Sequence, residues 1–231
     1  MRVRVAAALG LTAVTILALP ACSTHTTEAK PASTPSTQNR KSASPSRNAA
    51  PLSSAALKER LLDVSDLGAG YARKPEQPAH HDDVTVLGCP ALNGLGGDAA
   101  RGGSLDFPHR AKATFAYGGG SDSEVSEELY SDSADKLSTG TGRIFEAMTG
   151  CPKYQVLVGG TAVDIATQKS DSPRLGDERW SQLMTFSAGG RDTVVKQTAV
   201  RDASTLVVVS GSPALVDQHL AQAHAKATAA R

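Results

Sequence analysis

Residues 179–210 read RWSQLMTFSAGGRDTVVKQTAVRDASTLVVVS, and this stretch decides the fold class. Two runs with strand-like composition, residues 179–187 and 193–201, flank the turn Ala188-Gly189-Gly190. Two such runs joined by a glycine-rich turn predict an antiparallel hairpin. The third run, residues 205–210, is almost continuously apolar, which is typical of a buried strand. Three consecutive strands are therefore predicted here.

More strands are predicted on the N-terminal side of this stretch. Residues 154–158 and 162–167 flank Gly159-Gly160, which is a second hairpin signal. Three further runs have the alternation or composition of strands: residues 84–87, 112–117 and 125–129. The last run lies within the acidic segment Glu124-Val125-Ser126-Glu127-Glu128. We predict that these glutamates form the solvent-exposed face of an edge strand.

Helices are predicted at three places. Residues 133–148 carry one apolar face: Leu137, Thr141, Ile144, Phe145 and Met148. A first helix opens at Leu52-Ser53-Ser54 with Ser53 as its cap, carries Leu57, Leu61 and Leu62 on one face, and ends at the turn of residues 66–70. A last helix opens at Ser212-Pro213. The inner face of that last helix includes His219, which we interpret as a packing residue. This order of elements predicts an α+β fold, with a mainly antiparallel twisted sheet packed with helices.

The first 51 residues have the composition of targeting and tether segments. Residues 1–21 combine a basic start, an uncharged apolar run and a small-residue end, as in a lipoprotein signal peptide. Leu19-Pro20-Ala21-Cys22 resembles the lipobox of bacterial lipoproteins, which predicts diacylglycerol on Cys22. The alternative is simple secretion with Cys22 as a free thiol. Residues 22–51 would form a disordered Ser/Thr/Pro/Ala tether, and residues 52–231 one folded domain.

A lipidated Cys22 fixes the expected location. Acyl chains such as palmitate hold a protein stably to a bilayer without a spanning helix when two or more are attached. We therefore expect the protein on the extracellular face of the cell membrane, with the membrane itself as a partner. The whole chain carries 24 Lys+Arg and 23 Asp+Glu without a basic cluster, so no nucleic-acid partner is expected.

The cysteine count fits this location. Of three cysteines, Cys22 would carry the lipid, which leaves Cys89 and Cys151 in an oxidising compartment. Each of the two precedes a proline. We predict a Cys89–Cys151 disulfide that stabilises the fold by about 4 kcal/mol. Free reactive thiols or a metal site are the competing interpretations.

Motifs that carry catalysis are missing from the sequence. It contains no G-x-S-x-G elbow, no H-E-x-x-H, no Walker loop and no G-x-G-x-x-G between a strand and a helix. The cluster His80-His81-Asp82-Asp83 is rich in possible metal ligands, but adjacent residues of an extended segment point to opposite sides. We predict a solvated loop there, and no catalytic residue, metal or cofactor.

One segment could line a ligand site. Residues 172–180 place Arg174, Asp177, Glu178 and the only tryptophan, Trp180, beside a turn. These four residues are the candidate ligand-binding residues, because charged and aromatic groups together can read a polar ligand. The competing interpretation is structural: Asp177 and Glu178 satisfy a turn and an ion pair while Trp180 fills the core.

The domain resembles the extracellular sensor domain of the mycobacterial PknH-type kinases and of free-standing actinobacterial lipoproteins that share it. The resemblance covers roughly residues 52–228 and rests on five pieces in order: LLDVSDLGAGY at residues 61–71, Cys89-Pro90, Phe145-x-x-Met148-x-x-Cys151, Leu175-Gly176-Asp177-Glu178, and the apolar strand followed by a C-terminal helix. The sequence departs from the kinases because it contains no kinase domain, and its three cysteines cannot supply the second disulfide of that sensor.

The resemblance implies a sensor-like α+β domain with a concave, cleft-like face and without catalytic residues. We therefore expect a non-enzymatic lipoprotein that binds a small molecule, an envelope component or a partner protein. The alternatives are a structural or scaffolding envelope lipoprotein and a hydrolase that acts on envelope material. A PsbP-like α/β/α sandwich is the alternative fold, which strand order would distinguish.

Overall fold

The computed structural model describes residues 50–76, 84–96, 107–118, 123–158 and 160–229. The predicted signal peptide, Cys22, nearly all of the tether and the cluster His80-His81-Asp82-Asp83 lie outside these residues. No helix among the described residues is long and apolar enough to cross a membrane.

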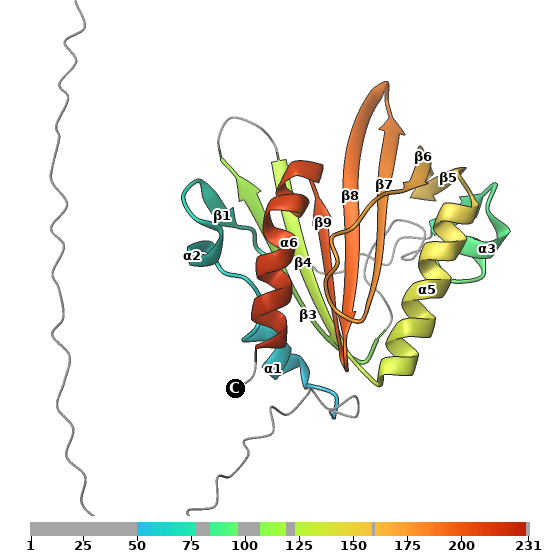
Figure 1. Ribbon diagram of the computed structural model, residues 1–231. Helices are drawn as coiled ribbons and strands as arrows, with labels where there is room; N and C mark the ends of the chain where they lie inside the picture. Colours follow the sequence, from blue (N-terminus) through green and yellow to red (C-terminus); the bar gives the residue numbers. More distant parts are fainter. Residues whose placement is uncertain (1–49, 77–83, 97–106, 119–122, 159, 230–231) are drawn as a thin grey trace, which may run out of the picture. The chain divides into compact units, whose positions relative to one another are not determined.

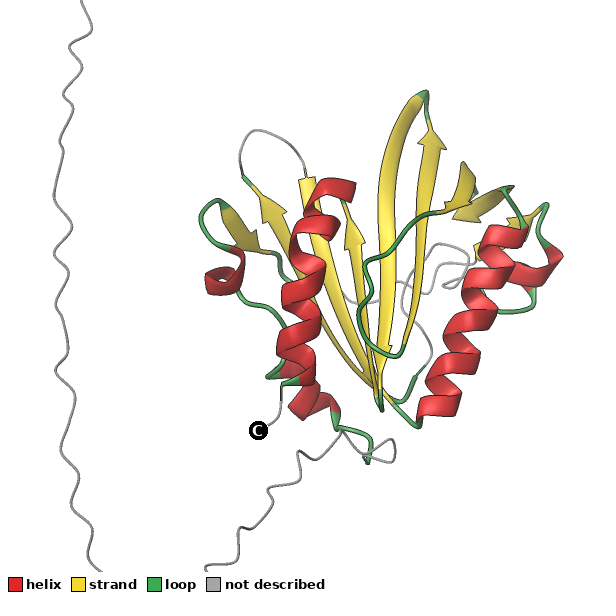
Figure 2. Ribbon diagram, in the orientation of Figure 1, coloured by secondary structure: helices red, strands yellow, loops and turns green. Residues whose placement is uncertain are grey.

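Nine strands of the described residues form one sheet in the order β1-β3-β4-β9-β8-β7-β6-β5-β2 (Figure 1). All neighbouring strands are antiparallel. The strands are β1 (Tyr71–Arg73), β2 (Val84–Leu87), β3 (His109–Tyr117), β4 (Ser123–Ser131), β5 (Lys153–Val158), β6 (Thr161–Lys169), β7 (Glu178–Ala188), β8 (Arg191–Asp202) and β9 (Thr205–Gly211). The helices are α1 (Ser54–Lys58), α2 (Val64–Leu67), α3 (Pro90–Asn93), α5 (Ala134–Gly150) and α6 (Pro213–Thr228) (Figure 2). The predicted α+β fold class is confirmed.

The β7–β8 hairpin forms as the glycine turn predicts. Ala188 pairs with Arg191, so Gly189 and Gly190 make a two-residue loop. Their φ angles of 57° and 74° lie in the left-handed region that this kind of hairpin turn requires. Strand β9 then pairs with β8 on one side and β4 on the other, which places this almost continuously apolar run inside the sheet.

Helices α5 and α6 pack against opposite faces of the sheet. Successive residues of a strand point to opposite faces. In β9, Val207 and Val209 pack in one core cluster with α6 and α1. Leu206 and Val208 pack instead in a cluster with α5. Strand β9 is therefore buried on both faces, which is why its sequence is continuously apolar.

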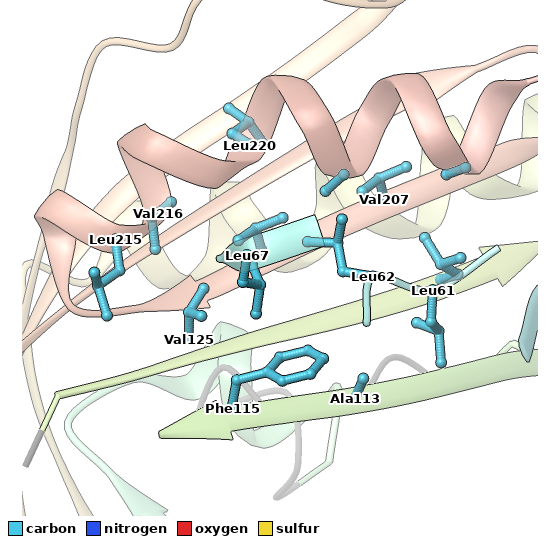
Figure 3. Packing of buried hydrophobic residues seen from close by; sticks show 14 of the residues in the cluster. Leu61, Leu62, Leu67, Ala113, Phe115, Val125, Val207, Leu215, Val216 and Leu220 are labelled. Atoms are coloured by element: carbon cyan, nitrogen blue, oxygen red, sulfur yellow. The ribbon is translucent and has the colours of Figure 1, made fainter. Parts of the chain in front are cut away.

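The α6 face contains the larger core cluster (Figure 3). Leu215, Val216 and Leu220 of α6 lie over Val125 and Val207 of the sheet. The segment from α1 to α2 adds Leu57, Leu61, Leu62 and Leu67 to the same cluster. Packing of these leucines fixes the N-terminal end of the domain on β3 and β4.

The other face is closed by α5 and the disulfide. Met148 and Ala147 of α5 pack with Val156, Ile165 and Met184 of the sheet. The predicted bond between Cys89 and Cys151 is confirmed, with the two Cα atoms 5.7 Å apart. This bond joins the end of α5 to the segment before α3.

Three local expectations were wrong. The expected first helix is two separate helices: α1 ends at Lys58, and α2 begins at Val64, where the Asp63 side chain caps it by accepting hydrogen bonds from the N–H groups of Ser65 and Asp66. Strand β4 is not an edge strand, since it lies between β3 and β9. Its Glu127 and Glu128 are only 1% and 7% exposed, so they do not form a solvent-exposed face.

Candidate functional site

The predicted ligand-binding segment meets Arg201 of β8. The guanidinium of Arg201 donates to Asp177 Oδ2 at 3.0 Å and to Glu178 Oε2 at 2.9 Å. Asp177 also accepts from the backbone N–H of Ala203 at 3.0 Å, and Glu178 accepts from the Ser138 hydroxyl of α5 at 3.1 Å. The two carboxylates therefore join β7, the β8–β9 turn and α5 around one cation.

The charges of this cluster interact with one another. The hydrogen bond from Arg201, supported by one from Ser138, lowers the pKa of Glu178 despite the opposing effect of burial. Glu178 is therefore ionised at neutral pH and forms an ion pair with Arg201. The arrangement holds the turn before β7 in place. Both carboxylates are paired with Arg201, so neither is an unpaired charge that faces a ligand.

The other two predicted residues lie apart from this pairing. Trp180 is half-buried, and its ring centroid lies 6.4 Å from that of Phe145 on α5. Arg174 is exposed and forms no ion pair with another residue of the described ranges. The structure thus brings Asp177 and Glu178 together on Arg201, places Trp180 against α5, and leaves Arg174 in solvent. A ligand role for the four residues stays a prediction.

A second polar cluster, which the sequence analysis missed, lies on β3 and β4. Lys112 Nζ lies 2.6 Å from Glu128 Oε1, and the Tyr130 hydroxyl donates to the other oxygen of Glu128. Neighbouring positions 113, 125 and 129 face the α6 core. Because successive strand residues point to opposite faces, residues 112, 128 and 130 lie on the other face of the sheet, which α5 covers further along. Glu128 is buried but satisfied by both partners.

Beside this cluster, five neutral polar residues lie in register across five neighbouring strands. Each is directly paired with the next in the order Thr114 (β3), Ser126 (β4), Ser210 (β9), Gln197 (β8) and Gln182 (β7). All five share the face of Glu128 and Trp180. We call these five residues the polar row. At the typical strand spacing of about 4.8 Å, the row spans roughly 19 Å.

The two ends of the polar row differ in burial. Thr114, Ser126 and Ser210 are half-buried, whereas Gln197 and Gln182 are 5% and 0% exposed. Gln182 donates to Gln197 at 3.1 Å, and its own carbonyl oxygen has no hydrogen-bond partner among the described residues. The row therefore runs from a solvent-accessible end to a buried amide pair beside α5.

On the opposite face, Glu127 lies inside the α6 core. Its Oε2 accepts the backbone N–H of Leu62 at 2.6 Å, and its Oε1 has no partner in the described part of the chain. Burial raises the pKa of Glu127 to about 7, and the hydrogen bond from Leu62 opposes the rise only in part. Nearby, the Tyr71 hydroxyl lies 2.7 Å from His219 Nε2, so His219 is a satisfied core residue as its position predicted.

Nothing in the described ranges assembles a metal centre. No group of three or more His, Cys, Asp or Glu side chains there lies close enough together to hold an ion. The polar row could not be found from the sequence, because its members come from five strands and only the strand order and register align them.

Comparison with known proteins shows the fold. No family model matches the chain, and no curated protein matches it. Among solved structures, the extracellular domain of PknH from Mycobacterium tuberculosis is similar, with a TM-score of 0.56 and 13% sequence identity. The match covers 77% of this chain and 97% of that domain. The described domain therefore shares the fold of the PknH extracellular domain, as the resemblance predicted.

Proposed function

We propose that this chain is a lipid-anchored protein of the extracellular face of the cell membrane, whose sensor-like domain binds a ligand without chemistry. The ligand is a small molecule, an envelope component or a partner protein. The observation that carries the proposal is the fold shared with nearly all of a kinase extracellular domain. The Cys89–Cys151 disulfide supports an oxidising compartment, and the lipobox-like sequence before Cys22 supports the anchor.

A non-catalytic role is supported by how the charged groups are used. Asp177 and Glu178 are paired with Arg201, and Glu128 is paired with Lys112. A general acid or base needs a group that can reach a substrate proton with a suitable pKa. These carboxylates bind other parts of the same domain instead.

Lipid labelling tests the anchor. Cells that express the full chain are fed an alkyne analogue of palmitate, and the purified protein is assayed for the label. We expect label on the wild type and on the neighbouring control Ser23→Ala, and none on Cys22→Ala. Label that persists on Cys22→Ala, or is missing from the wild type, would show that Cys22 is not the anchor.

Mass spectrometry tests ligand binding. The protein is extracted from its own membranes, and its mass is compared under native and denaturing conditions. We expect a reproducible excess mass in the native spectrum. Denaturation should remove this excess mass, because the ligand is not covalently attached. A native mass equal to the denatured mass at every extraction condition would contradict a retained small ligand and favour a partner protein or a scaffolding role.

A further inference from the structure

The polar row is an unusual use of the middle of a sheet. Interior strand positions bury apolar side chains by default, and a polar group removed from water loses free energy unless it is hydrogen-bonded. Here two of the five polar positions, Gln197 and Gln182, are buried, and the Gln182 carbonyl oxygen is left without a partner in the described structure. A buried position that departs from the usual apolar pattern in this way is often a functional site.

The half-exposed end of the row has free hydrogen-bonding capacity. The Thr114 hydroxyl donates to Ser126 Oγ over a long 3.4 Å. The Ser210 side chain forms no hydrogen bond with any other described residue. Helices α1 and α6, which pack on β3 and β4, lie on the other face of these strands. Among the described residues, three hydroxyl groups on adjacent strands thus keep hydrogen-bonding capacity that a ligand could use.

The charges beside this end select against an ionic ligand. Lys112, two residues from Thr114, is neutralised by Glu128. Lys74, whose backbone N–H donates to the Thr114 carbonyl, is neutralised by Glu124. Both lysines are therefore paired, so neither offers a free charge to an ionic ligand. The hydrogen-bonding groups of the row itself are neutral.

We propose that the polar row binds a neutral carbohydrate, with Thr114, Ser126 and Ser210 as its contact residues and the buried amide pair of Gln197 and Gln182 closing the row. This inference deepens the proposed function and rests on it. Sugar hydroxyls donate and accept hydrogen bonds, as do Ser and Thr hydroxyls and Gln amides. A ligand dense in hydroxyl groups can therefore satisfy several members of the row at once.

A glycan array followed by calorimetry tests the proposal. The full-length protein in detergent is probed with printed neutral and acidic oligosaccharides, and the best neutral one is titrated. We expect Thr114→Val and Ser210→Ala each to weaken binding by about three- to tenfold, the effect of one lost hydrogen bond. The matched controls Thr185→Val and Ser187→Ala, on β7 but on the opposite face, should bind as the wild type does. Far-UV circular dichroism confirms that each variant is folded, and Thr114→Val suffices should Ser210→Ala not fold.

Three results would overturn it. One is an array that retains no neutral oligosaccharide, and another is binding restricted to acidic ones. The third is neutral binding that folded Thr114→Val and Ser210→Ala leave unchanged. If the native mass spectrum then shows a retained peptide or other ligand, the proposed ligand-binding function stands while the carbohydrate inference fails.

Discussion

The Glu127 carboxyl is buried with one of its two oxygens unpaired among the described residues. It lies in the leucine-rich core between β4 and α6 with one hydrogen bond, from the Leu62 N–H. Burial makes the charged form unfavourable, and the charges of Lys226, Asp66 and Arg73 change this only slightly because they partly cancel. The protonated carboxyl is therefore the form that suits the folded state.

Glu127 should make the stability of the domain depend on pH. Its pKa is about 7 when folded against 4.5 as the reference, so the folded chain holds the proton while the unfolded chain releases it. The stabilising contribution is complete below pH 4.5 and is lost as the pH rises through 7. The loss amounts to about 3 kcal/mol. In Glu127→Gln this slope should vanish.

Denaturant unfolding at pH 4 and pH 8 measures this effect. The difference in unfolding free energy between wild type and Glu127→Gln should shift by about 3 kcal/mol between the two pH values, in favour of the variant at pH 8. Glu124→Gln in the same strand is the control, because Glu124 is exposed. An unchanged difference would mean that Glu127 titrates normally in the folded state.

Gly176 fixes the turn that brings Asp177 to Arg201. Its φ is +59°, and a Cβ there would lie 2.4 Å from the Arg201 carbonyl oxygen. Gly176→Ala should therefore lower the stability of the domain by about 1–2 kcal/mol for the left-handed conformation, and further because of the steric clash. Gly189→Ala is the matched control, since Gly189 has φ +57° with open space around it. Thermal unfolding should show a clearly larger loss for Gly176→Ala, and equal losses would contradict the close contact.

The sequence predicted only those parts of the candidate site that depend on residues close together in the chain. Asp177 and Glu178 are neighbours in sequence, so an ion pair near a turn was foreseeable, although Arg201 as their partner was not. Glu127 and Glu128 were misjudged because acidic residues in a strand usually face water. Their burial follows from the β4–β9 pairing, which joins positions about 80 residues apart.

At the scale of elements, α5 depends on the disulfide at its C-terminal end. The helix contains Gly140 and Gly142, each of which weakens a helix by roughly 1 kcal/mol relative to Ala. A Cβ at Gly140 would lie 2.9 Å from the tip of the Phe107 ring, so this ring would have to shift to accommodate one. The bond from Cys151 to Cys89 compensates by fixing the helix end against α3.

Removing that bond should lower stability without changing the fold. The double variant Cys89→Ala/Cys151→Ala opens a loop with a sequence separation of 62 residues. Loop-closure entropy then predicts a loss of about 4 kcal/mol. Urea unfolding measures it, and reducing agent should lower the wild type to the level of the variant while leaving the variant unchanged. A variant as stable as the oxidised wild type would show that the bond does not constrain the unfolded chain.

Elements were predicted well where periodicity is strong. The β7–β8 hairpin, β9, α5 and α6 lie within a few residues of their expected places because glycine turns and apolar faces define them. Strand β1 and helix α3 were not predicted, since three or four residues carry too little pattern. The strand order, which places β2 at one edge and β1 at the other, arises from long-range packing that no local pattern encodes.

For the whole molecule, the central strands couple the two faces. Val200 of β8 packs on the α6 side, whereas Ala199 packs on the α5 side. Loss of either helix therefore exposes strands on which the other helix also depends. This arrangement favours unfolding of the described domain as one cooperative unit.

The only tryptophan of the chain allows that cooperativity to be tested. Trp180 packs near Phe145 on the α5 side, whereas Leu220 of α6 is buried in the cluster on the other face. Leu220→Ala should cost about 2–5 kcal/mol, as buried leucine truncations do. In one cooperative unit, the Trp180 fluorescence midpoint in urea falls together with the far-UV circular dichroism midpoint. If the fluorescence midpoint stayed at the wild-type value while the dichroism fell in two steps, the two faces would be independent, and a ligand bound on the polar row would stabilise only the α5 side.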